Sequence, residues 1–412
     1  MPYGGERGPF TLDRAPFVRE VLRMVRHPDV EEITLCFAAQ IAKTLICQLV
    51  VLYYMAEEPD ECLHVMAKKD DAVSLNCDRY QKIVRASPRL AGFLTGAAHD
   101  MTREAIRFTN GSALHFASAQ SPSDLASRTI RILILDETDK FVEFSGKEAD
   151  PIALAMERTE RRTDRKILKA STPTTDRGYI NQEFLQGDRR RFHVPCPHCG
   201  VYQVLYMPGI KWPEGERDPD RILDQNLAWY ECGACAGRIN DLDKVAMLRR
   251  GVWCPETMKV NEDGELEGEA PPLRRLSYHL SRLYSTSSNH TFSRIAAQFL
   301  RNHKFPSKLM NFRNSWLAEV WEDKVEEVTA AHVRERVGGY IIGTVPSEAH
   351  VLTAGVDVQL DHLWYVIRAW GAYGESWLVR QGRVEDWEAL HLILFDSRYM
   401  AGPDPIALKC VL

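Results

Sequence analysis

The chain has 412 residues, of which 45% are hydrophobic and 26% are charged, which is typical of a folded protein with two or three domains and excludes a disordered one. Its formal net charge of −5 excludes a global positive field, so a nucleic-acid partner has to be held by a local basic patch. The longest apolar run, "LICQLVVLYYMA", is too short to span a bilayer, and "MPYGGERGPF" has no signal-peptide pattern, so we expect a cytosolic chain without membrane contact.

The first half of the chain alternates predicted helices with predicted strands. Apolar spacing predicts an amphipathic helix over residues 17–26, a buried strand in "EEITLCFA", an apolar helix over residues 44–56 and a strand in "CLHVMA". A hairpin with its turn at Asn110-Gly111 follows, and then a strand in "TIRILILDETDKF", a helix in "PIALAMERTERR" and a strand in "KILKAST". This alternation predicts an α/β fold with a parallel sheet and ligands at the carboxyl ends of its strands.

The junction "FAAQIAKT" lies where a phosphate-binding loop would be expected. The usual loop is G-x-x-x-x-G-K-[ST], but here Phe37 and Ala42 occupy the glycine positions before Lys43 and Thr44. A positive φ at Ala42 would cost roughly 1 kcal/mol or more because of its Cβ atom. Taken alone, this stretch favours a plain strand-to-helix junction.

Two further strand ends change that interpretation. Asp136 and Glu137 end an apolar run, where one carboxylate could support Mg²⁺ and the next could polarise a water, although an acidic helix cap is the simpler alternative. Small hydroxyl residues end "KILKAST", where a γ-phosphate could be sensed. Together the three strand ends predict nucleotide hydrolysis. We expect residues 33–44 and 131–137 on adjacent strands of one sheet, with Lys43 facing Asp136.

Two Cys-x-x-Cys pairs interrupt the strand and helix rhythm. Cys196 and Cys199 form "CPHC", and Cys232 and Cys235 form "CGAC". Four thiolates suit a closed, structural, tetrahedral Zn²⁺ site, which we favour over unrelated reduced thiols. His198 lies inside the first pair and is expected to be a bystander.

The last segment has an all-strand start. "HVLTAGVDVQ", "HLWYVIRAWG" and "ESWLVRQGRV" are predicted strands, followed by a helix in "EDWEALHLIL" and an edge strand in "PIALKCVL". This order is the opening of a ribonuclease-H-like fold, in which a two-metal nuclease places one acid on the first strand. Asp357 fits that position, and we expect it to be a buried carboxylate midway along an apolar strand, where a metal role is favoured.

These motifs resemble the large terminase subunit of tailed phages, in its lambda-type branch. The resemblance rests on "QIAKT", "LILDETD" and "ASTPT", and also on "SPSDLASRTIR", "ADPIALAMERTERRTDRKI", "GDRRRFHVPCPHCG", "YHLSRLYS", "FRNSWLAEVWED" and "AGVDVQLDHL". It covers essentially the whole chain. It implies an ATP-driven motor that packages double-stranded viral DNA into a procapsid, joined to a metal-dependent endonuclease that cuts concatemers. It also implies a small terminase subunit and a portal as partners, a homo-oligomeric ring, and the host cytoplasm as location.

The resemblance also implies roles for individual residues. Gln40, Lys43, Thr44, Asp136, Ser171 and Thr172 would form the site for ATP and Mg²⁺. Among them Lys43 would contact the β- and γ-phosphates, Thr44 the Mg²⁺, and Asp136 would support the metal. Glu137 would orient the water, Ser171 and Thr172 would couple phosphate state to DNA movement, and Asp357 would bind a nuclease metal. The departure is Ala42, where the family has glycine. Arg158, Arg161 and Arg162 are candidates for an arginine finger, although an exposed basic helix face is favoured.

The expected organisation has four segments: an ATPase domain over residues 1–190, a zinc-ribbon-like insert over 191–258, a mixed linker or return segment over 259–345, and an incomplete ribonuclease-H-like domain over 346–412. The family's second nuclease acid would fall beyond Leu412, so a C-terminal truncation is expected. Two alternatives stay open, namely another nucleic-acid translocase of the helicase class and an inactive prophage remnant that binds through its zinc module.

Overall fold

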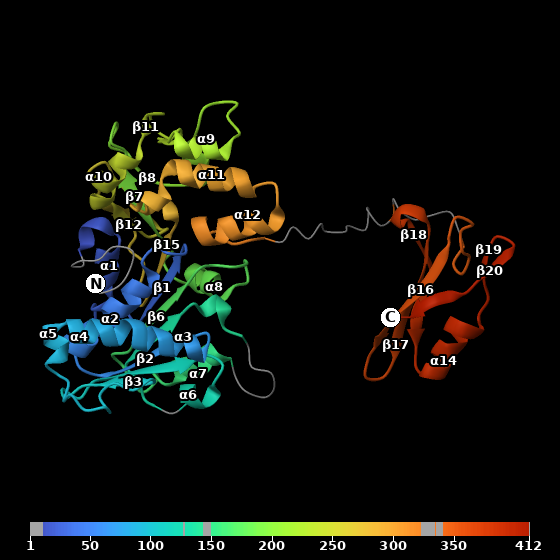
Figure 1. The fold of residues 1–412 in the computed structure, drawn as a ribbon, viewed down its shortest axis with the longest axis horizontal. Coiled ribbons are helices and arrows are strands. Elements are labelled where there is room, and N and C mark those ends of the chain that lie inside the picture. Colours follow the sequence, from blue (N-terminus) through green and yellow to red (C-terminus); the bar gives the residue numbers. More distant parts are fainter. Residues whose placement is uncertain (1–10, 127, 143–149, 323–333, 335–340, 412) are drawn as a thin grey trace. The chain divides into compact units, whose positions relative to one another are not determined.

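The computed structural model describes residues 11–126, 128–142, 150–322, 334 and 341–411. It separates two compact units, Met1–Asp323 and Lys324–Leu412, which are described one at a time (Figure 1). Among the described residues, no helix combines the length and the apolar character needed to cross a membrane.

A ten-stranded sheet is the centre of the first unit, with the order β12-β7-β15-β1-β6-β5-β2-β4-β3 and with β8 paired to β7. The strands from β7 to β4 in this order are parallel, and β12, β3 and β8 are antiparallel to their neighbours. The strand bounds are β1 Glu32–Phe37, β2 Glu61–Met66, β3 Ala105–Arg107, β4 Ala113–Ser118, β5 Ile132–Asp136, β6 Lys166–Ser171, β7 Arg190–Pro195, β8 Tyr202–Val204, β12 Val252–Cys254 and β15 Arg275–Leu280.

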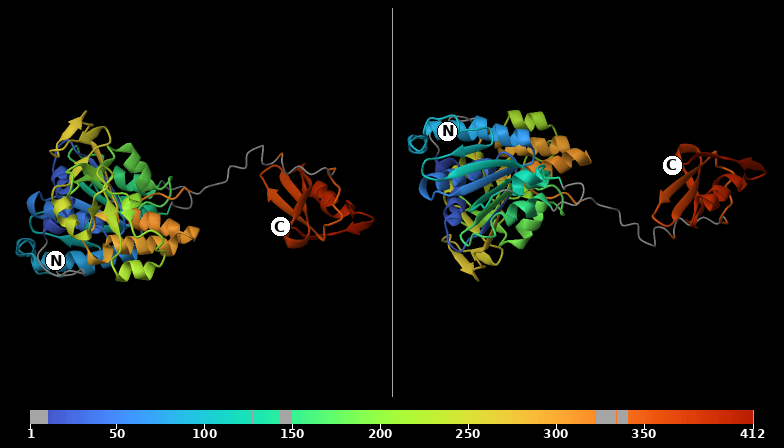
Figure 2. Two further views of the ribbon diagram at one scale, coloured as in Figure 1. Left: turned by 90° about the horizontal axis from the view of Figure 1, so that it is seen from above. Right: turned by 90° about the horizontal axis from the view of Figure 1, so that it is seen from below.

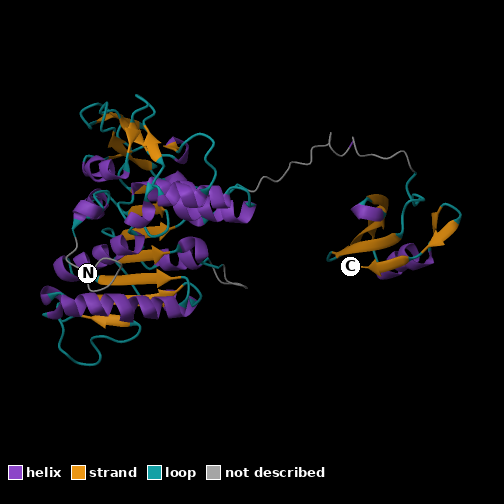
Figure 3. Cartoon of the chain, turned by 45° about the horizontal axis from the view of Figure 1, so that its top comes forward, coloured by secondary structure: helices purple, strands orange, loops and turns teal. Residues whose placement is uncertain are grey.

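Helices lie on both sides of this sheet (Figure 3). Figure 2 shows the same arrangement from two further directions. The α-helices are α1 Val18–Val25, α2 Lys43–Glu57, α3 Lys69–Ser74, α4 Gln81–Ala86, α5 Pro88–Ala91, α6 Pro122–Ala126, α7 Pro151–Glu157, α8 Tyr179–Gln186, α9 Pro219–Asp224, α10 Lys244–Arg249, α11 Phe292–Asn302 and α12 Pro306–Phe312. Two smaller sheets contain β9 Ile210–Lys211, β10 Trp229–Glu231 and β11 Arg238–Ile239, and β13 Met258–Val260 and β14 Leu266–Gly268.

Residue alternation along the strands explains the two helix layers. Ile132 and Ile134 of β5 pack in the core on the α2 side, whereas Leu133 and Leu135 pack with α6 and α7. Successive side chains of a strand point to opposite faces, so a central parallel strand is apolar on both. Asp136 follows the same alternation and lies on the α2 side. The predicted parallel sheet is thus confirmed, and so is the hairpin at Asn110-Gly111, which joins β3 and β4.

The expectation that the lysine-threonine strand and the Asp136 strand are adjacent is wrong. β6 lies between β1 and β5 and pairs in parallel with both. The sequence does not show this order because all three strands are buried along their whole length, and apolar periodicity then carries no information about which strands pair. The insertion of β6 brings the ends of all three strands to one edge of the sheet.

The large sheet also extends past residue 190, the predicted end of the ATPase segment. β7, β12 and β15 all belong to it, and β15 lies directly beside β1. The cysteine-rich segment between β7 and β12 is an excursion in which β8 folds back antiparallel on β7 before the chain returns to the sheet as β12, also antiparallel to β7. The division of the chain into four segments otherwise stays a prediction.

The second unit contains a four-stranded sheet of order β18-β17-β16-β21. Its elements are β16 Val351–Val358, β17 Leu363–Trp370, β18 Ser376–Val384, α14 Trp387–His391, β19 Tyr399–Ala401, β20 Asp404–Ile406 and β21 Leu408–Val411. β16, β17 and β18 form an antiparallel meander, and β21 returns parallel to β16 as an edge strand. The predicted strand in "PIALKCVL" is divided between β20, which pairs with β19, and β21.

Candidate active site

The loop between β1 and α2 adopts its turns without glycine. Gln40 and Ala42 both have left-handed backbone conformations, with φ of 57° and 67°. Ala42 is the residue before α2, and its side chain offers no cap, so the first N–H groups of a 15-residue helix are left for a ligand. A helix N-terminus of this kind is a favourable site for phosphate. Ala42 therefore has the positive φ that costs a residue with a Cβ atom roughly 1 kcal/mol or more.

Lys43 points into this loop. Its Nζ donates to the carbonyl oxygens of Phe37 and Ala38 at 3.0 and 2.7 Å, and to Thr172 Oγ1 at 2.7 Å. Burial lowers the pKa of Lys43 to about 8, although the charge of Asp136 opposes the shift. The ammonium group is thus held by neutral oxygens, which phosphate oxygens would outcompete because charged acceptors make stronger hydrogen bonds.

Thr44 and Asp136 meet across two elements. Thr44 Oγ1, in the first turn of α2, donates to Asp136 Oδ2 at 3.1 Å. Asp136 is fully buried at the end of β5, and burial together with the neighbouring Glu137 charge raises its pKa to about 6. Its Oδ1 atom is buried without a hydrogen-bond partner among the described residues. A hydroxyl beside an unsatisfied carboxylate oxygen fits the oxygen ligands that Mg²⁺ takes in proteins.

Glu137 and Gln40 lie at the outer side of this site. Glu137 has a left-handed backbone with φ of 63°, and its carboxylate accepts a 2.9 Å contact from Lys140 Nζ. The Gln40 side chain is exposed. The structure therefore brings Lys43, Thr44, Asp136 and Thr172 together, whereas Glu137 is paired with Lys140.

The hydroxyl residues at the end of β6 connect the site to α8. Ser171 Oγ accepts from the backbone N–H of Asp139 at 3.2 Å. The Asp139 carboxylate in turn accepts from the Thr174 hydroxyl at 2.8 Å and from the Ile180 N–H at 2.7 Å. Ser171 is thus linked through Asp139 to the start of α8, whereas Thr172 contacts Lys43.

The four predicted cysteines form one cluster. The Sγ atoms of Cys196, Cys199, Cys232 and Cys235 all lie within 4.8 Å of one another, with two separations of 3.9 Å. A tetrahedral site with Zn–S bonds of about 2.3 Å has S–S separations of about 3.8 Å, so the sulfurs fit a metal of this kind. His198 is a bystander, as predicted, because its Nε2 lies 2.7 Å from the Arg238 carbonyl oxygen.

Asp357 is not buried, contrary to the expectation. It is the penultimate residue of β16, is exposed, and accepts from Gln359 Nε2 at 2.8 Å. The reason is alternation, since Leu352 and Ala354 occupy the buried face of β16 and Asp357 lies on the other. Across the described ranges, the cysteine cluster is the one group of three or more potential metal-ligating side chains. A metal role for Asp357 stays a prediction.

Comparison with protein families decides the classification. A family model described as the ATPase domain of the phage terminase large subunit gpA matches residues 4–253, and one described as the gpA endonuclease domain matches residues 275–398. This chain belongs to the gpA family of phage terminase large subunits.

Two individual relatives are terminase large subunits. The chain is 26% identical over 393 residues to the terminase large subunit of Escherichia phage lambda, covering 91% of this chain and 60% of that protein. It is 24% identical over 415 residues to that of Enterobacteria phage P21, covering 95% and 62%. The chain therefore spans about 60% of the length of these curated relatives.

Two solved structures are also similar. The large terminase of bacteriophage HK97 is 13% identical with a TM-score of 0.42, over 95% of this chain and 67% of that one. The ATPase domain of the Thermus phage P74-26 large terminase is 15% identical with a TM-score of 0.40, over 76% and 94%.

The arginine-finger candidates lie away from the phosphate loop of their own chain. The carbonyl of Arg158 accepts from the N–H of Ile130, before the start of β5, and Arg162 pairs with Asp60, before the start of β2. Asp136 lies at the other end of β5, so these arginines are at the opposite edge of the sheet. Arg161 is exposed.

Sequence reasoning missed Arg282. Its Nε donates to the Ala39 carbonyl at 2.9 Å, and its guanidinium lies 4.3 Å from the centre of the Trp316 ring. Burial lowers its pKa to about 10. The Ala39 N–H donates to the Ser315 carbonyl, so both backbone groups of Ala39 are held by later parts of the chain. The signal was "YHLSRLYS", a terminase-like motif to which no role was assigned.

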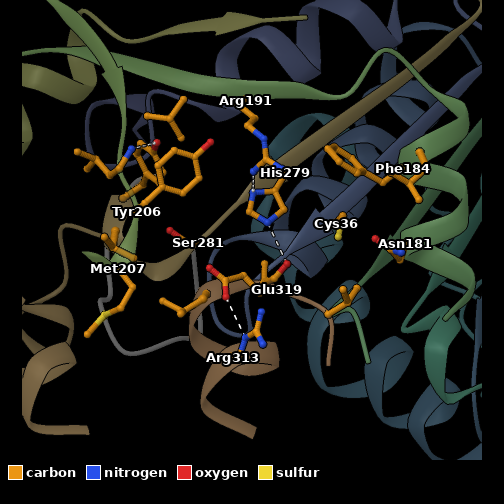
Figure 4. Close-up of a pocket in the computed structure, with 18 residues that line it drawn as sticks. Cys36, Asn181, Phe184, Arg191, Tyr206, Met207, His279, Ser281, Arg313 and Glu319 are labelled. Carbon is orange, nitrogen blue, oxygen red and sulfur yellow. Dashed lines mark hydrogen bonds and ion pairs between the residues drawn. The ribbon is translucent and has the colours of Figure 1, made fainter. Parts of the chain in front are cut away.

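Three such motifs converge on a pocket of about 260 Å³ that also includes Cys36 of β1 (Figure 4). "GDRRRFHVPCPHCG" contributes Arg191, "YHLSRLYS" contributes His279 and Ser281, and "FRNSWLAEVWED" contributes Arg313 and Glu319. Arg191 lies 3.1 Å from His279 Nδ1, and Arg313 pairs with Glu319 at 3.1 Å. These motifs therefore form a pocket beside Cys36, near the end of the strand that leads into the phosphate loop.

Proposed function

We propose that this chain hydrolyses ATP at the Lys43–Asp136 site and uses the energy to move double-stranded viral DNA into a procapsid. The observation that carries the proposal is the convergence of Lys43, Thr44, Asp136 and Thr172, from three different elements, at the carboxyl edge of the sheet. Membership in the gpA terminase family supports it, because the ATPase-domain match includes all four residues.

Each residue has a separate task in this proposal. Lys43 would transfer its hydrogen bonds from the Phe37 and Ala38 carbonyls to phosphate oxygens of ATP. Thr44 and Asp136 would hold Mg²⁺, which when bound neutralises charge on the phosphates. Glu137 would orient the attacking water after its carboxylate leaves Lys140. Thr172, bonded to Lys43, and Ser171, bonded to Asp139, would transmit the phosphate state to α8.

The cysteine cluster would hold one structural Zn²⁺. Each cysteine pair forms the same turn, in which a backbone N–H two residues after the first cysteine points at its sulfur at 3.4 Å, from His198 to Cys196 and from Ala234 to Cys232. Four thiolates leave no open coordination position, so the role is to fix the excursion between β7 and β12.

The partners of the whole assembly belong to the same proposal. They are double-stranded DNA, a small terminase subunit, a portal and procapsid, and further copies of the chain in a ring, acting in the host cytoplasm. The segment that matches the gpA endonuclease-domain model would belong to the part of the assembly that cuts DNA with a metal, with Asp357 as one candidate ligand.

An ATPase assay with and without double-stranded DNA tests the proposal. We expect hydrolysis that DNA stimulates, and we expect Lys43→Ala to abolish it. Lys82→Ala is the matched control, because Lys82 is an exposed helical lysine paired with Asp78, and it should retain activity. If Lys43→Ala hydrolyses ATP as well as Lys82→Ala, the proposed site is refuted; absent hydrolysis in the unaltered chain favours the inactive remnant.

A further inference from the structure

His64 is a buried polar side chain that the proposed reaction does not yet use. It lies in the middle of β2, opposite Ile134 of β5, and its side chain is fully buried on the same face as Asp136. Its two ring nitrogens face the Tyr80 hydroxyl and the Asp136 carboxylate. The 3.9 Å separation from Asp136 is longer than a hydrogen bond.

A neutral imidazole has one N–H donor and one acceptor nitrogen, so its two contacts are linked. Nδ1 lies 3.0 Å from the hydroxyl oxygen of Tyr80. Nε2 lies 3.9 Å from Asp136 Oδ2 and has no hydrogen-bond partner among the described residues. A phenol is a good donor and an imidazole nitrogen a good acceptor. A Tyr80 hydroxyl that donates to Nδ1 would leave the proton of His64 on Nε2, which faces the Asp136 carboxylate.

The ring is held in this orientation by aromatic neighbours. His64 stacks on Phe116 with an interplanar angle of 19°, and Tyr80 packs edge-on against both rings. Tyr80 ends the π-helical segment Leu75–Tyr80, a rare geometry that is frequent at functional sites. A histidine with a purely structural role would have both nitrogens bonded, since a buried donor without a partner costs about 1–3 kcal/mol.

We propose that His64, held as its Nε2–H tautomer by Tyr80, is a positioning residue for Asp136. A shift of about 1 Å would bring Nε2 within hydrogen-bond distance of Oδ2, where it would join Thr44 as a second donor. Two donors on Oδ2 orient the carboxylate and leave Oδ1 toward the metal. This role rests on the proposed ATPase function of Asp136.

The tautomer is testable without any activity measurement. In protein labelled with ¹⁵N-histidine, the resonances that disappear in His64→Gln identify His64. We expect the long-range ¹⁵N–¹H pattern of an Nε2–H tautomer, and a change of that pattern in Tyr80→Phe, which keeps the ring but removes the hydroxyl. An Nδ1–H tautomer in the unaltered protein would overturn the proposal.

The effect on Asp136 is tested by the Mg²⁺ dependence of ATP hydrolysis. A glutamine amide superimposes on Nε2 and keeps the donor, whereas asparagine superimposes on Nδ1 and loses it. We expect His64→Asn to need about tenfold more Mg²⁺ than the unaltered protein for half-maximal activity, because it loses a hydrogen bond to a charged group. His64→Gln should need nearly as little Mg²⁺ as the unaltered protein. His115→Asn is the control, because His115 is buried in β4 but bonded to Glu61.

Equal Mg²⁺ requirements in His64→Asn and His64→Gln would also overturn the positioning role. Failure of the proposed function itself gives a different result. The unaltered protein would then not hydrolyse ATP, and the tautomer measurement would still decide the inference about His64 and Tyr80.

Discussion

Replacing Ala42 by glycine should stabilise the protein, although the same change destabilises most helices. Ala42 has φ of 67° and ψ of 6°, the left-handed region, immediately before α2. An L-residue there costs about 1–2 kcal/mol relative to glycine. Glycine in turn makes the unfolded chain more flexible, at a cost of about 0.4–1 kcal/mol. The difference predicts a net gain of up to about 1.6 kcal/mol, centred near 0.8 kcal/mol.

Thermal and chemical denaturation without nucleotide measure this gain. A change near 0.8 kcal/mol in a unit of this size raises the melting temperature by only about 1 °C, so the chemical denaturation is the more sensitive measurement. Ala56→Gly is the matched control, because Ala56 lies in the same helix with helical geometry and should lose about 0.5–1 kcal/mol. ATP affinity or turnover should also rise in Ala42→Gly, because without the Cβ atom the loop N–H groups approach phosphate more closely.

The two variants should therefore change stability in opposite directions. If Ala42→Gly is destabilised as much as Ala56→Gly, the left-handed strain is not stored in the folded loop. An unchanged or lower ATPase rate would show that the loop is adapted to alanine and that its lack of glycine is no defect.

Three further predictions concern other sites. Purified protein should contain about one zinc per chain. Cys232→Ser should lose the metal and have a lower melting temperature, but it should still bind nucleotide. Protein that is purified without chelator and contains no zinc would contradict this prediction. The buried Asp136 carboxyl has a pKa of about 6 in the folded protein, compared with the ordinary value of 3.8, so the free energy of unfolding falls as the pH rises between these two values. Asp136→Asn, which has no such charge to bury, should therefore be more stable than the unaltered protein at pH 8, by up to about 3 kcal/mol. Urea denaturation at pH 4 and pH 8 should show that difference shrinking at the lower pH. Plasmid incubated with the protein and Mn²⁺ should stay uncut, because among the described residues no cluster of metal-ligating side chains surrounds the exposed Asp357. Nicking of the plasmid that Asp357→Ala abolishes would disprove this prediction.

Local patterns in the sequence were sufficient for most elements of the fold. Apolar periodicity predicted the strands β1, β2, β5 and β6 and the helices α2 and α7, because the spacing of apolar residues depends on whether one or both faces of an element are buried. Asn110-Gly111 predicted its hairpin, since a tight turn needs residues that tolerate positive φ, and Gly111 has φ of 87°. The spacing of the two cysteine pairs likewise predicted a cluster of four sulfurs.

Strand order and the faces of single residues were decided only by the tertiary structure. β6 lies between β1 and β5, and all three strands are buried along their whole length, so apolar periodicity does not distinguish their possible pairings. Asp357 looked buried within its apolar strand but lies on the exposed face of β16, since exposure depends on what covers each side of a sheet. His64 could not be recognised at all, because its partners Tyr80 and Asp136 are 16 and 72 residues away and meet it only after β2 and β5 pair.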